Sequence, residues 1–230
     1  MQKAQTALEY LHLSKSLELR LNAKHPPAVL CFIDASHAVN PKRRSQGAAC
    51  IGLGRGHIHA STASLKQNTK SSLESEYITT ADDVTDAIYV RNYLLELGYD
   101  VPPATIYQDN EAAIKLCNNG VSSSHKSRHI DIRHFFIEDR VSSGHIRVKY
   151  VNTKDMIADF LTKPLMGSQL YKLRDLLLGY TTLWEGCARD HYDAQSSLIR
   201  QYIVIYFFLS YIIYAHLVDR ISILLLIVGQ

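Results

Sequence analysis

Apolar and polar residues follow two different periods along the chain, and these periods predict both strands and helices. Ala28–Ile33 is an almost unbroken apolar run, which is typical of a central strand buried on both faces. His145–Val151 alternates apolar with basic residues, the pattern of a half-buried strand. From Ser71 to Gly98 apolar residues recur at helical spacing, with Ser71 or Ser72 as the N-cap. One chain therefore combines both element types.

The order of the predicted elements indicates an α/β fold. The expected strands are Ala28–Ile33, Ala48–Leu53, His57–Ser64, Ala104–Asp109 and His145–Val151. The expected helices are Ala7–Leu21, Ser71–Gly98, Glu111–Cys117, His129–Val141, Lys154–Thr162 and Ser168–Leu178. Three antiparallel strands come first, and helices join the later, parallel ones. We expect one mixed five-stranded sheet, with strand order 3-2-1-4-5, flanked by helices on both faces.

Changes in composition divide the chain into three regions. Residues 1–27 form an N-terminal helix and a connector that contains two prolines, residues 28–180 hold the predicted sheet, and residues 181–230 are an apolar tail. Within the tail, Tyr202–Val218 contains no Asp, Glu, Lys or Arg, which is near the minimum length of a membrane span. Three interpretations stay open for the tail: translated sequence beyond the original domain, a membrane anchor, or a packed helix.

Charge and cysteine content narrow the function classes only slightly. The net charge of +3 and the pI of about 8.6 are compatible with a nucleic-acid partner but do not demonstrate one. The four cysteines lack CxxC spacing, which favours buried free thiols in a reducing compartment over disulfides or zinc. The N-terminus lacks the apolar core of a secretory signal, so we expect a cytoplasmic protein that is not secreted.

Four acidic residues occur in settings that would bring them together. Asp34 and Asp109 follow apolar strands, where an unpaired carboxylate is costly. Glu76 lies on the sheet-facing side of the long predicted helix, and Asp159 lies at a helix start. Taken alone, the two strand acids are also typical of turns or caps, and the two helix acids of solvated positions. Together they predict a cluster that a hard divalent cation would neutralise.

Five sequence blocks carry a family resemblance. They are CFIDAS, SSLESEY, IYQDNEAA, HKSRHIDIRHFFIEDRV and GHIRVKYVNTKDMIADFLTKPL. In their order and in their residues they resemble the ribonuclease H domain of Ty1/copia-type retrotransposon polyproteins, over roughly Leu30–Gly179. The family pattern places its four acids on Asp34, Glu76, Asp109 and Asp159, the same residues that the strand and helix positions indicate. The resemblance implies a ribonuclease H-like fold.

The resemblance also implies an activity, a cofactor and partners. We expect an RNA–DNA hybrid ribonuclease, an endonuclease that hydrolyses the RNA strand with two Mg²⁺ ions, with Mn²⁺ as the alternative ion. Asp34 would bridge both ions, Glu76 and Asp109 would hold one, and Asp159 the other. The implied partners are the hybrid and the reverse transcriptase domain of the same polyprotein, and the family resemblance adds virus-like particles and the nucleus as locations.

Basic residues near the predicted site are candidates for contacts to nucleic acid. The candidates are Arg43, Arg44, Lys126, Arg128, Arg147 and Lys149. Their positions suit a rim that contacts phosphates, and solvated charge on an exposed face is the open alternative.

The sequence departs from the family pattern just after the first acid. Ser36 and His37 stand where related copies usually have an aspartate and a tryptophan. Neither is one of the four acids, so the predicted site is complete. The alternative function is a catalytically silent, decayed or domesticated fragment that keeps the fold and at most binds nucleic acid.

Overall fold

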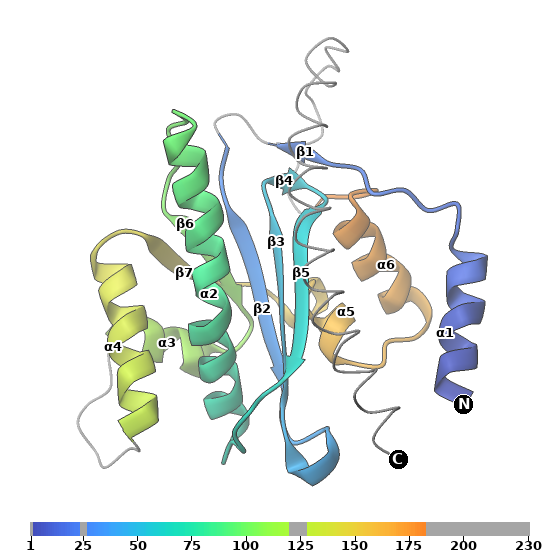
Figure 1. Cartoon of the computed structure of the whole chain (residues 1–230), viewed down its shortest axis with the longest axis horizontal. Helices are drawn as coiled ribbons and strands as arrows, with labels where there is room; N and C mark the ends of the chain where they lie inside the picture. Colours follow the sequence, from blue (N-terminus) through green and yellow to red (C-terminus); the bar gives the residue numbers. More distant parts are fainter. Residues whose placement is uncertain (1, 24–26, 120–127, 183–230) are drawn as a thin grey trace, which may run out of the picture. The chain divides into compact units, whose positions relative to one another are not determined.

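A mixed five-stranded sheet forms the centre of the computed structural model, which describes residues 2–23, 27–119 and 128–182 (Figure 1). Its strands are β2 (Leu30–Ser36), β3 (Gln46–Gly52), β5 (His57–Ser64), β6 (Ala104–Gln108) and β7 (Ile146–Tyr150). They lie in the order β5-β3-β2-β6-β7. Strand β3 is antiparallel to β2 and β5, whereas β6 is parallel to β2 and β7.

The predicted mixed sheet is therefore confirmed, with one inexact feature. Numbered along the chain within this sheet, the strands follow the order 3-2-1-4-5. The prediction omitted two short strands, β1 (Asn22–Ala23) and β4 (Gly54–Arg55), which pair with each other in a separate sheet. When all seven described strands are numbered along the chain, the order of this sheet is therefore 5-3-2-6-7.

Strand β2 continues past the apolar run that predicted it. The expected strand ended at Ile33, with Asp34 just beyond it, but Asp34 lies inside β2. The reason is the antiparallel partner, because β3 pairs Asp34 with Ala48 and Ser36 with Gln46. Backbone pairing thus carries the strand beyond its apolar residues and fixes the Asp34 backbone in the ladder.

Helices cover both faces of the sheet (Figure 1). One face packs against α2 (Ser72–Glu96), α3 (Glu111–Asn119) and α4 (Arg128–Ser142), and the other against α5 (Asp159–Thr162) and α6 (Gly167–Leu178). Side chains alternate along β2, so Cys31 and Ile33 join the first core and Phe32 joins the second. Cys31, Cys50 and Cys117 are buried free thiols, as predicted for these three cysteines.

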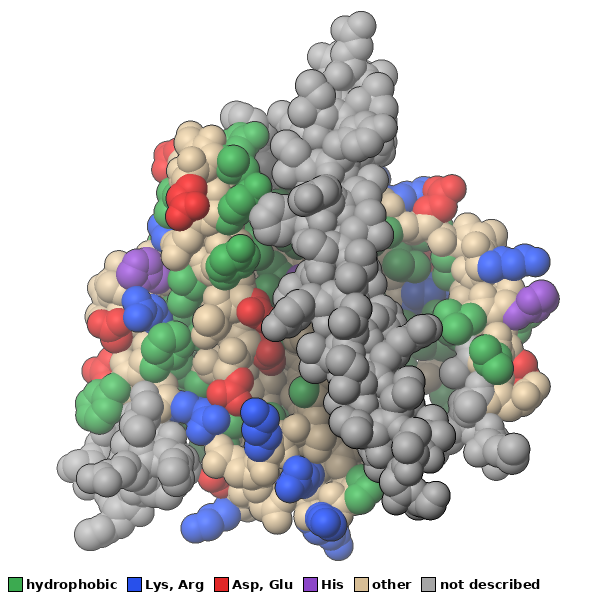
Figure 2. Space-filling view, in the orientation of Figure 1, with side chains coloured by type: hydrophobic (Ala, Val, Ile, Leu, Met, Phe, Trp, Pro, Cys, Tyr) green, Lys and Arg blue, Asp and Glu red, His purple; other side chains and the backbone are tan. Residues whose placement is uncertain are grey.

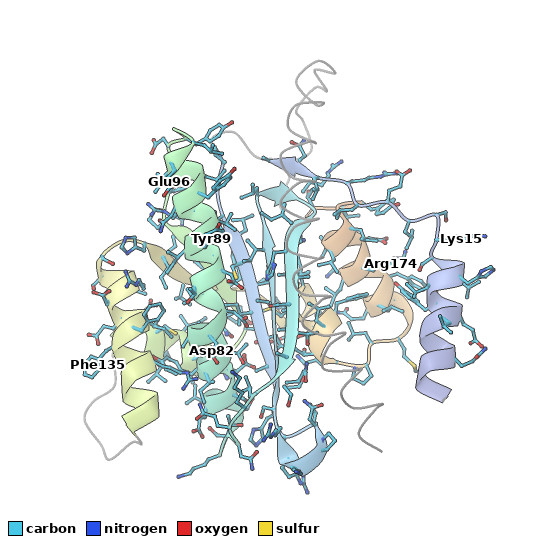
Figure 3. All side chains as sticks on the ribbon, viewed as in Figure 1. Lys15, Asp82, Tyr89, Glu96, Phe135 and Arg174 are labelled. Atoms are coloured by element: carbon cyan, nitrogen blue, oxygen red, sulfur yellow. The ribbon has the colours of Figure 1, made fainter. Side chains whose placement is uncertain are left out.

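Helix α2 crosses the central strands at very close range. Ser71 caps its N-terminus by accepting a hydrogen bond from the Glu74 amide, at the predicted position. Gly47 on β3 permits the close approach, because a Cβ at this position would lie 2.7 Å from Oγ1 of Thr79. On the outer face, Asp82 accepts a hydrogen bond from Arg133 of α4 at 3.0 Å, and Figure 3 shows Asp82, Tyr89 and Glu96 along the helix.

Two predicted helices differ from the structure. The N-terminal helix is α1 (Gln2–Leu13), which ends well before Leu21. The predicted helix Lys154–Thr162 is instead a 3₁₀ turn, η2 (Thr153–Asp155), followed by the short helix α5. Met156, Ile157 and Ala158, which lie between these two elements, are all buried in the second core.

The segment after α1 packs onto the end of α6. The Arg20 amide donates to the Leu178 carbonyl at 2.8 Å, and the Arg20 guanidinium lies 4.2 Å from the Tyr180 ring centroid. The Glu18 amide donates to the Tyr180 hydroxyl at 2.9 Å. Residues 1–187 accordingly form one compact unit, which includes the predicted N-terminal region.

The predicted tail falls almost wholly outside the described residues. The structure describes the predicted tail only at residues 181–182. Among the described helices, none is long and apolar enough to cross a membrane. Tyr202–Val218 lies outside the part of the chain that the structure describes, so the membrane interpretation of this segment stays a prediction.

Candidate active site

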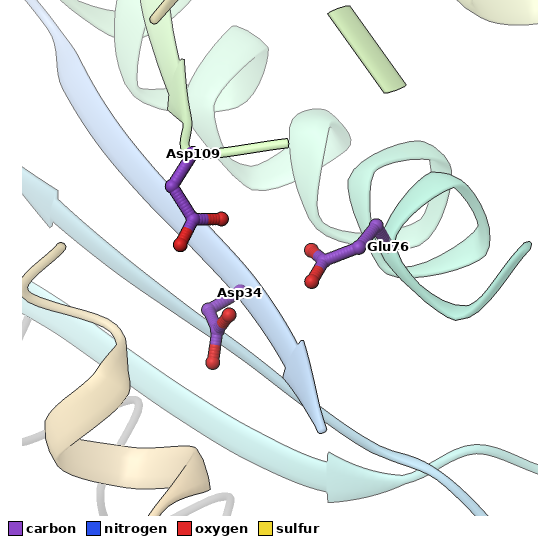
Figure 4. A group of neighbouring side chains, drawn as sticks. All are labelled: Asp34, Glu76 and Asp109. Carbon is purple, nitrogen blue, oxygen red and sulfur yellow. The ribbon is translucent and has the colours of Figure 1, made fainter. Parts of the chain in front are cut away.

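Three of the four predicted acids converge at one end of the sheet. Asp34 comes from β2, Glu76 from the second turn of α2, and Asp109 from the residue after β6. One carboxylate oxygen of each lies within 4.8 Å of the others. Figure 4 shows the three carboxyl groups directed toward a shared space. This arrangement follows from the parallel pairing of β2 and β6, whose carboxyl ends meet at the same edge of the sheet.

A short chain of hydrogen bonds positions the turn of α2 that carries Glu76. The Gln108 amide donates to the Thr80 hydroxyl at 2.8 Å, and this hydroxyl donates to the Glu76 carbonyl at 2.8 Å. Because Gln108 ends β6 and directly precedes Asp109, these bonds join the backbone of Glu76 to the strand that presents Asp109. The spacing of the two acids is thereby tied to backbone structure.

Glu76 is buried and incompletely paired. It is 4% exposed, and its Oε2 atom has no hydrogen-bond partner among the described residues. Burial, with smaller contributions from Asp34 and Asp109, raises the pKa of Glu76 to about 9. An unsatisfied carboxylate oxygen beside two further carboxylates fits a hard divalent cation, which takes oxygen ligands.

Asp159, the fourth predicted acid, lies beside this group and is paired with a lysine. Its Oδ1 atom accepts from Nζ of Lys163 at 2.6 Å, and the same ammonium lies 3.5 Å from Oδ1 of Asp34. The Thr162 hydroxyl donates to Oδ2 of Asp34. Burial raises the pKa of Asp159 to about 7, although the hydrogen bond from Lys163 opposes this rise. Burial lowers the pKa of Lys163, but Asp34 and Asp159 outweigh burial and raise that pKa overall.

An open pocket of about 660 Å³ gives access to the acids. Its lining comprises Asp34, Ala35, Ser36, His37, Val39, Ser72, Glu76, Asp109, Asn110, Glu111, Ala112 and Lys163. Ser36 and His37, the residues that depart from the family pattern, thus line the pocket next to the first acid. Hydrogen bonds hold both, from the Ser36 hydroxyl to the Thr162 carbonyl at 3.1 Å and between His37 and Thr69 at 3.1 Å.

The predicted basic residues occupy two places in the described part of the chain. Arg43 and Arg44 are exposed at the turn after β2, where η1 (Pro41–Arg43) leads into β3. Arg147 and Lys149 lie on the edge strand β7, which runs parallel to β6. Lysine and arginine side chains gather at the end of the visible face where β2 meets this turn (Figures 1 and 2). Lys126 and the side chain of Arg128 are outside the described residues.

Three residues of the site were absent from the prediction. They are Lys163, Thr162 and Gln108, which contact or position the acids. A signal existed for Lys163, because it follows Asp159 by four residues, the spacing of a helical ion pair. The partners of Thr162 and Gln108 are distant along the chain, and their residue types gave no such signal.

The sheet and the acids define a class of protein. A mixed sheet in this order, with helices on both faces and acids at the ends of its central strands, is the ribonuclease H-like architecture that the sequence predicted. Homologous sequences narrow this class further. The retrovirus-related Pol polyproteins from transposons RE2 and RE1 of Arabidopsis thaliana are 41% and 42% identical to the chain over 113 residues. The homologues are thus Pol polyproteins of copia-type transposons, and the predicted resemblance is confirmed.

The matched region is about half of this chain and a small part of each homologue. It covers 48% of the chain and 8% of each polyprotein. No family model matches the chain. Among solved structures, the N-terminal RNase H domain of Rv2228c from Mycobacterium tuberculosis, fused to maltose binding protein, has a TM-score of 0.45 at 13% identity, covering 65% of this chain and 97% of that one. LC11-RNase H1, isolated from compost, has a TM-score of 0.42 at 16% identity, covering 58% and 91%.

Proposed function

We propose that the chain carries a ribonuclease H domain that hydrolyses the RNA strand of an RNA–DNA hybrid. The convergence of Asp34, Glu76 and Asp109 in an open pocket supports this proposal most strongly. The homologous Pol polyproteins support the same class of enzyme. In such a polyprotein, the reverse transcriptase domain would be the partner that supplies the hybrid.

The acids would hold two divalent cations, Mg²⁺ or Mn²⁺. Asp34, Glu76 and Asp109 provide one group of oxygen ligands, and Asp34 with Asp159 provides the second. When bound, the cations supply Lewis-acid stabilisation of charge on the attacking and leaving oxygens of the phosphodiester. The protein needs no nucleophile of its own, and its acids orient the reacting groups by fixing the positions of the cations.

The basic residues would hold the substrate along its phosphates. Arg43 and Arg44 lie in the turn after β2, and Arg147 and Lys149 lie on β7, and both sets would contact phosphates of the bound hybrid outside the pocket itself. Lys126 and Arg128 are part of the same proposed rim. Selection of RNA would come from contacts to 2′-hydroxyls in the wide, shallow minor groove of the hybrid.

Replacement of one acid tests the proposed activity. We expect Asp109→Asn to lower the rate of hybrid cleavage by about 10²-fold or more, because a neutral amide binds a divalent cation poorly. The measurement is cleavage of a labelled hybrid by the full chain with Mg²⁺. Asp100→Asn, at an exposed position before β6, serves as the matched control and should cleave like the wild type. Equal rates for the Asp109 variant and the wild type would show that catalysis does not use this site.

A catalytically silent fragment that binds hybrids is the second candidate. Ser36 and His37 favour it, since they change the pocket wall next to Asp34. Isothermal titration with hybrid distinguishes the two functions. Binding of the hybrid without Mg²⁺ uptake and without product supports the silent fragment.

A further inference from the structure

Among the described residues, a lysine pairs with one half of the acid cluster. The ammonium of Lys163 bridges Asp159, at 2.6 Å, and Asp34, at 3.5 Å. Both aspartates are nearly fully buried, so a cation between them removes a large electrostatic cost. A lysine side chain thus already occupies the position between the two carboxylates that the proposed function assigns to the second divalent ion.

Within the described part of the chain, no lysine or arginine pairs with Glu76 or Asp109 in the other half of the cluster. Asp34, Glu76 and Asp109 offer oxygens within 4.8 Å of one another, and Oε2 of Glu76 has no partner among the described residues. Asp34 belongs to both halves, with Oδ1 near Lys163 and Oδ2 accepting from Thr162. A first divalent ion can therefore enter without displacing a protein cation, whereas a second cannot.

We propose that Lys163 is a built-in competitor of the second divalent ion and must leave the Asp34–Asp159 pair before that ion binds. This inference rests on the proposed function, because it assumes that the acids bind divalent cations. The Lys163 side chain is 36% exposed and lines the open pocket, so its flexible stem can swing toward solvent. The site consequently fills in a fixed order, first at Asp34, Glu76 and Asp109 and then at Asp34 and Asp159.

Mn²⁺ binding to the full chain, without nucleic acid, tests this competition. Electron paramagnetic resonance counts free Mn²⁺ during a titration and separates tight from weak ions. Lys163→Met removes the charge but keeps most of the side-chain length. We expect the dissociation constant of the second ion to fall by at least about tenfold in this variant, since a unit charge within 4 Å is removed, while that of the first ion changes little.

Three further variants separate the effect of position from the effects of total charge and of misfolding. Lys172→Met also removes one lysine of a close ion pair, here with Asp155 at 2.5 Å, and should bind both ions like the wild type. Lys163→Arg keeps a positive charge at the site and should also leave the second ion weak. If circular dichroism shows that Lys163→Met is unfolded, Lys163→Gln takes its place. The second ion should then bind more tightly to Lys163→Gln than to the wild type.

The outcomes separate this inference from the proposed function. Unchanged or weaker binding of the second ion in both neutral Lys163 variants would overturn the competition, even if the wild type cleaves hybrids. Tighter binding of the second ion in these variants, with no cleavage by any of them or by the wild type, would support the competition and overturn the nuclease. Tighter binding that the Lys172 variant matches would attribute the effect to net charge and reject the role of Lys163.

Discussion

Burial favours the protonated form of the Glu76 carboxyl group when no cation is bound. Burial and the nearby acids raise its pKa from 4.5 to about 9. Between these pH values the folded chain binds a proton that the unfolded chain releases. Its contribution to stability is therefore complete below about pH 4.5, and it is lost as the pH rises toward 9.

Replacing this carboxyl group with an amide should remove that pH dependence. Between pH 5 and pH 8, in the presence of a chelator, we expect the wild type to lose about 4 kcal/mol of unfolding free energy relative to Glu76→Gln. Urea unfolding at the two pH values measures the difference. Glu96→Gln changes an exposed acid on the same helix and should follow the wild type. If the unfolding free energies of the Glu76 variant and the wild type change with pH in parallel, the raised pKa of Glu76 is contradicted.

Single residues of the site were predictable to different degrees. Asp34 and Asp109 stood out because each follows an apolar run, and Glu76 because the helical period placed it on the sheet-facing side. Lys163 lies in a mixed segment that resembles ordinary surface, and its second partner, Asp34, is 129 residues away. A contact of that separation follows from the three-dimensional arrangement, which no local pattern contains.

The contact between α2 and β3 sets how Glu76 meets the strands. A methyl group at Gly47 would lie 2.7 Å from Oγ1 and 2.8 Å from Cγ2 of Thr79, one turn from Glu76. We expect Gly47→Ala to lower the free energy of unfolding by about 1–3 kcal/mol, because α2 must move away from the sheet. Urea unfolding measures this loss, and Mn²⁺ titration of the same variant should show a weaker first ion.

A double-mutant cycle tests whether crowding against Thr79 causes the loss of stability in Gly47→Ala. Thr79→Ala removes both nearby side-chain atoms, and the Thr79 hydroxyl has no hydrogen-bond partner among the described residues, so this change alone should cost little. The pair Gly47→Ala with Thr79→Ala should recover most of the stability. A double variant as unstable as the sum of the single variants would show that crowding against α2 is not the reason.

Helices and strands could be predicted where the apolar residues followed a single spacing. The long helix α2 and the strand β6 match their predictions, because α2 repeats its apolar face over many turns and β6 is a short, buried run. The segment Lys154–Thr162 misled the prediction, since its apolar residues are consecutive and pack as an irregular turn against the second core. Spacing alone does not distinguish a short helix from such a turn.

At the scale of the whole molecule, a backbone contact joins the N-terminal segment to the end of α6. Gly179 has a φ of +80°, and a Cβ at this position would clash with the Arg20 carbonyl oxygen, whereas Gly167, at the other end of α6, has a φ of +62° and open space around it. We expect Gly167→Ala to cost about 1 kcal/mol, from the left-handed backbone alone. Gly179→Ala should cost about 2 kcal/mol more, because the added methyl group displaces Arg20. Equal losses in urea unfolding would show that the methyl group at position 179 does not displace Arg20.

The order of elements could be predicted from the sequence, but this docking of the N-terminal segment could not. The prediction treated residues 1–27 as a separate helix and connector. Besides side-chain contacts such as those of Tyr180, backbone contacts join them to the sheet-bearing part, between Arg20 and Leu178 and between β1 and β4. Backbone groups are the same in every residue, so no pattern of side chains reveals which of them will meet.

The hydrogen bond between Arg20 and Leu178 has a topological consequence. Residues 20–178, which hold the sheet and helices α2 to α6, thus form a folded body that is closed at one neck, where Arg20 meets Leu178. A long multidomain chain can therefore carry this body as a side branch without stretching on either flank. Circular permutants, in which the two chain segments at this neck are joined and new termini are opened in a distant surface loop, should still fold to the same topology.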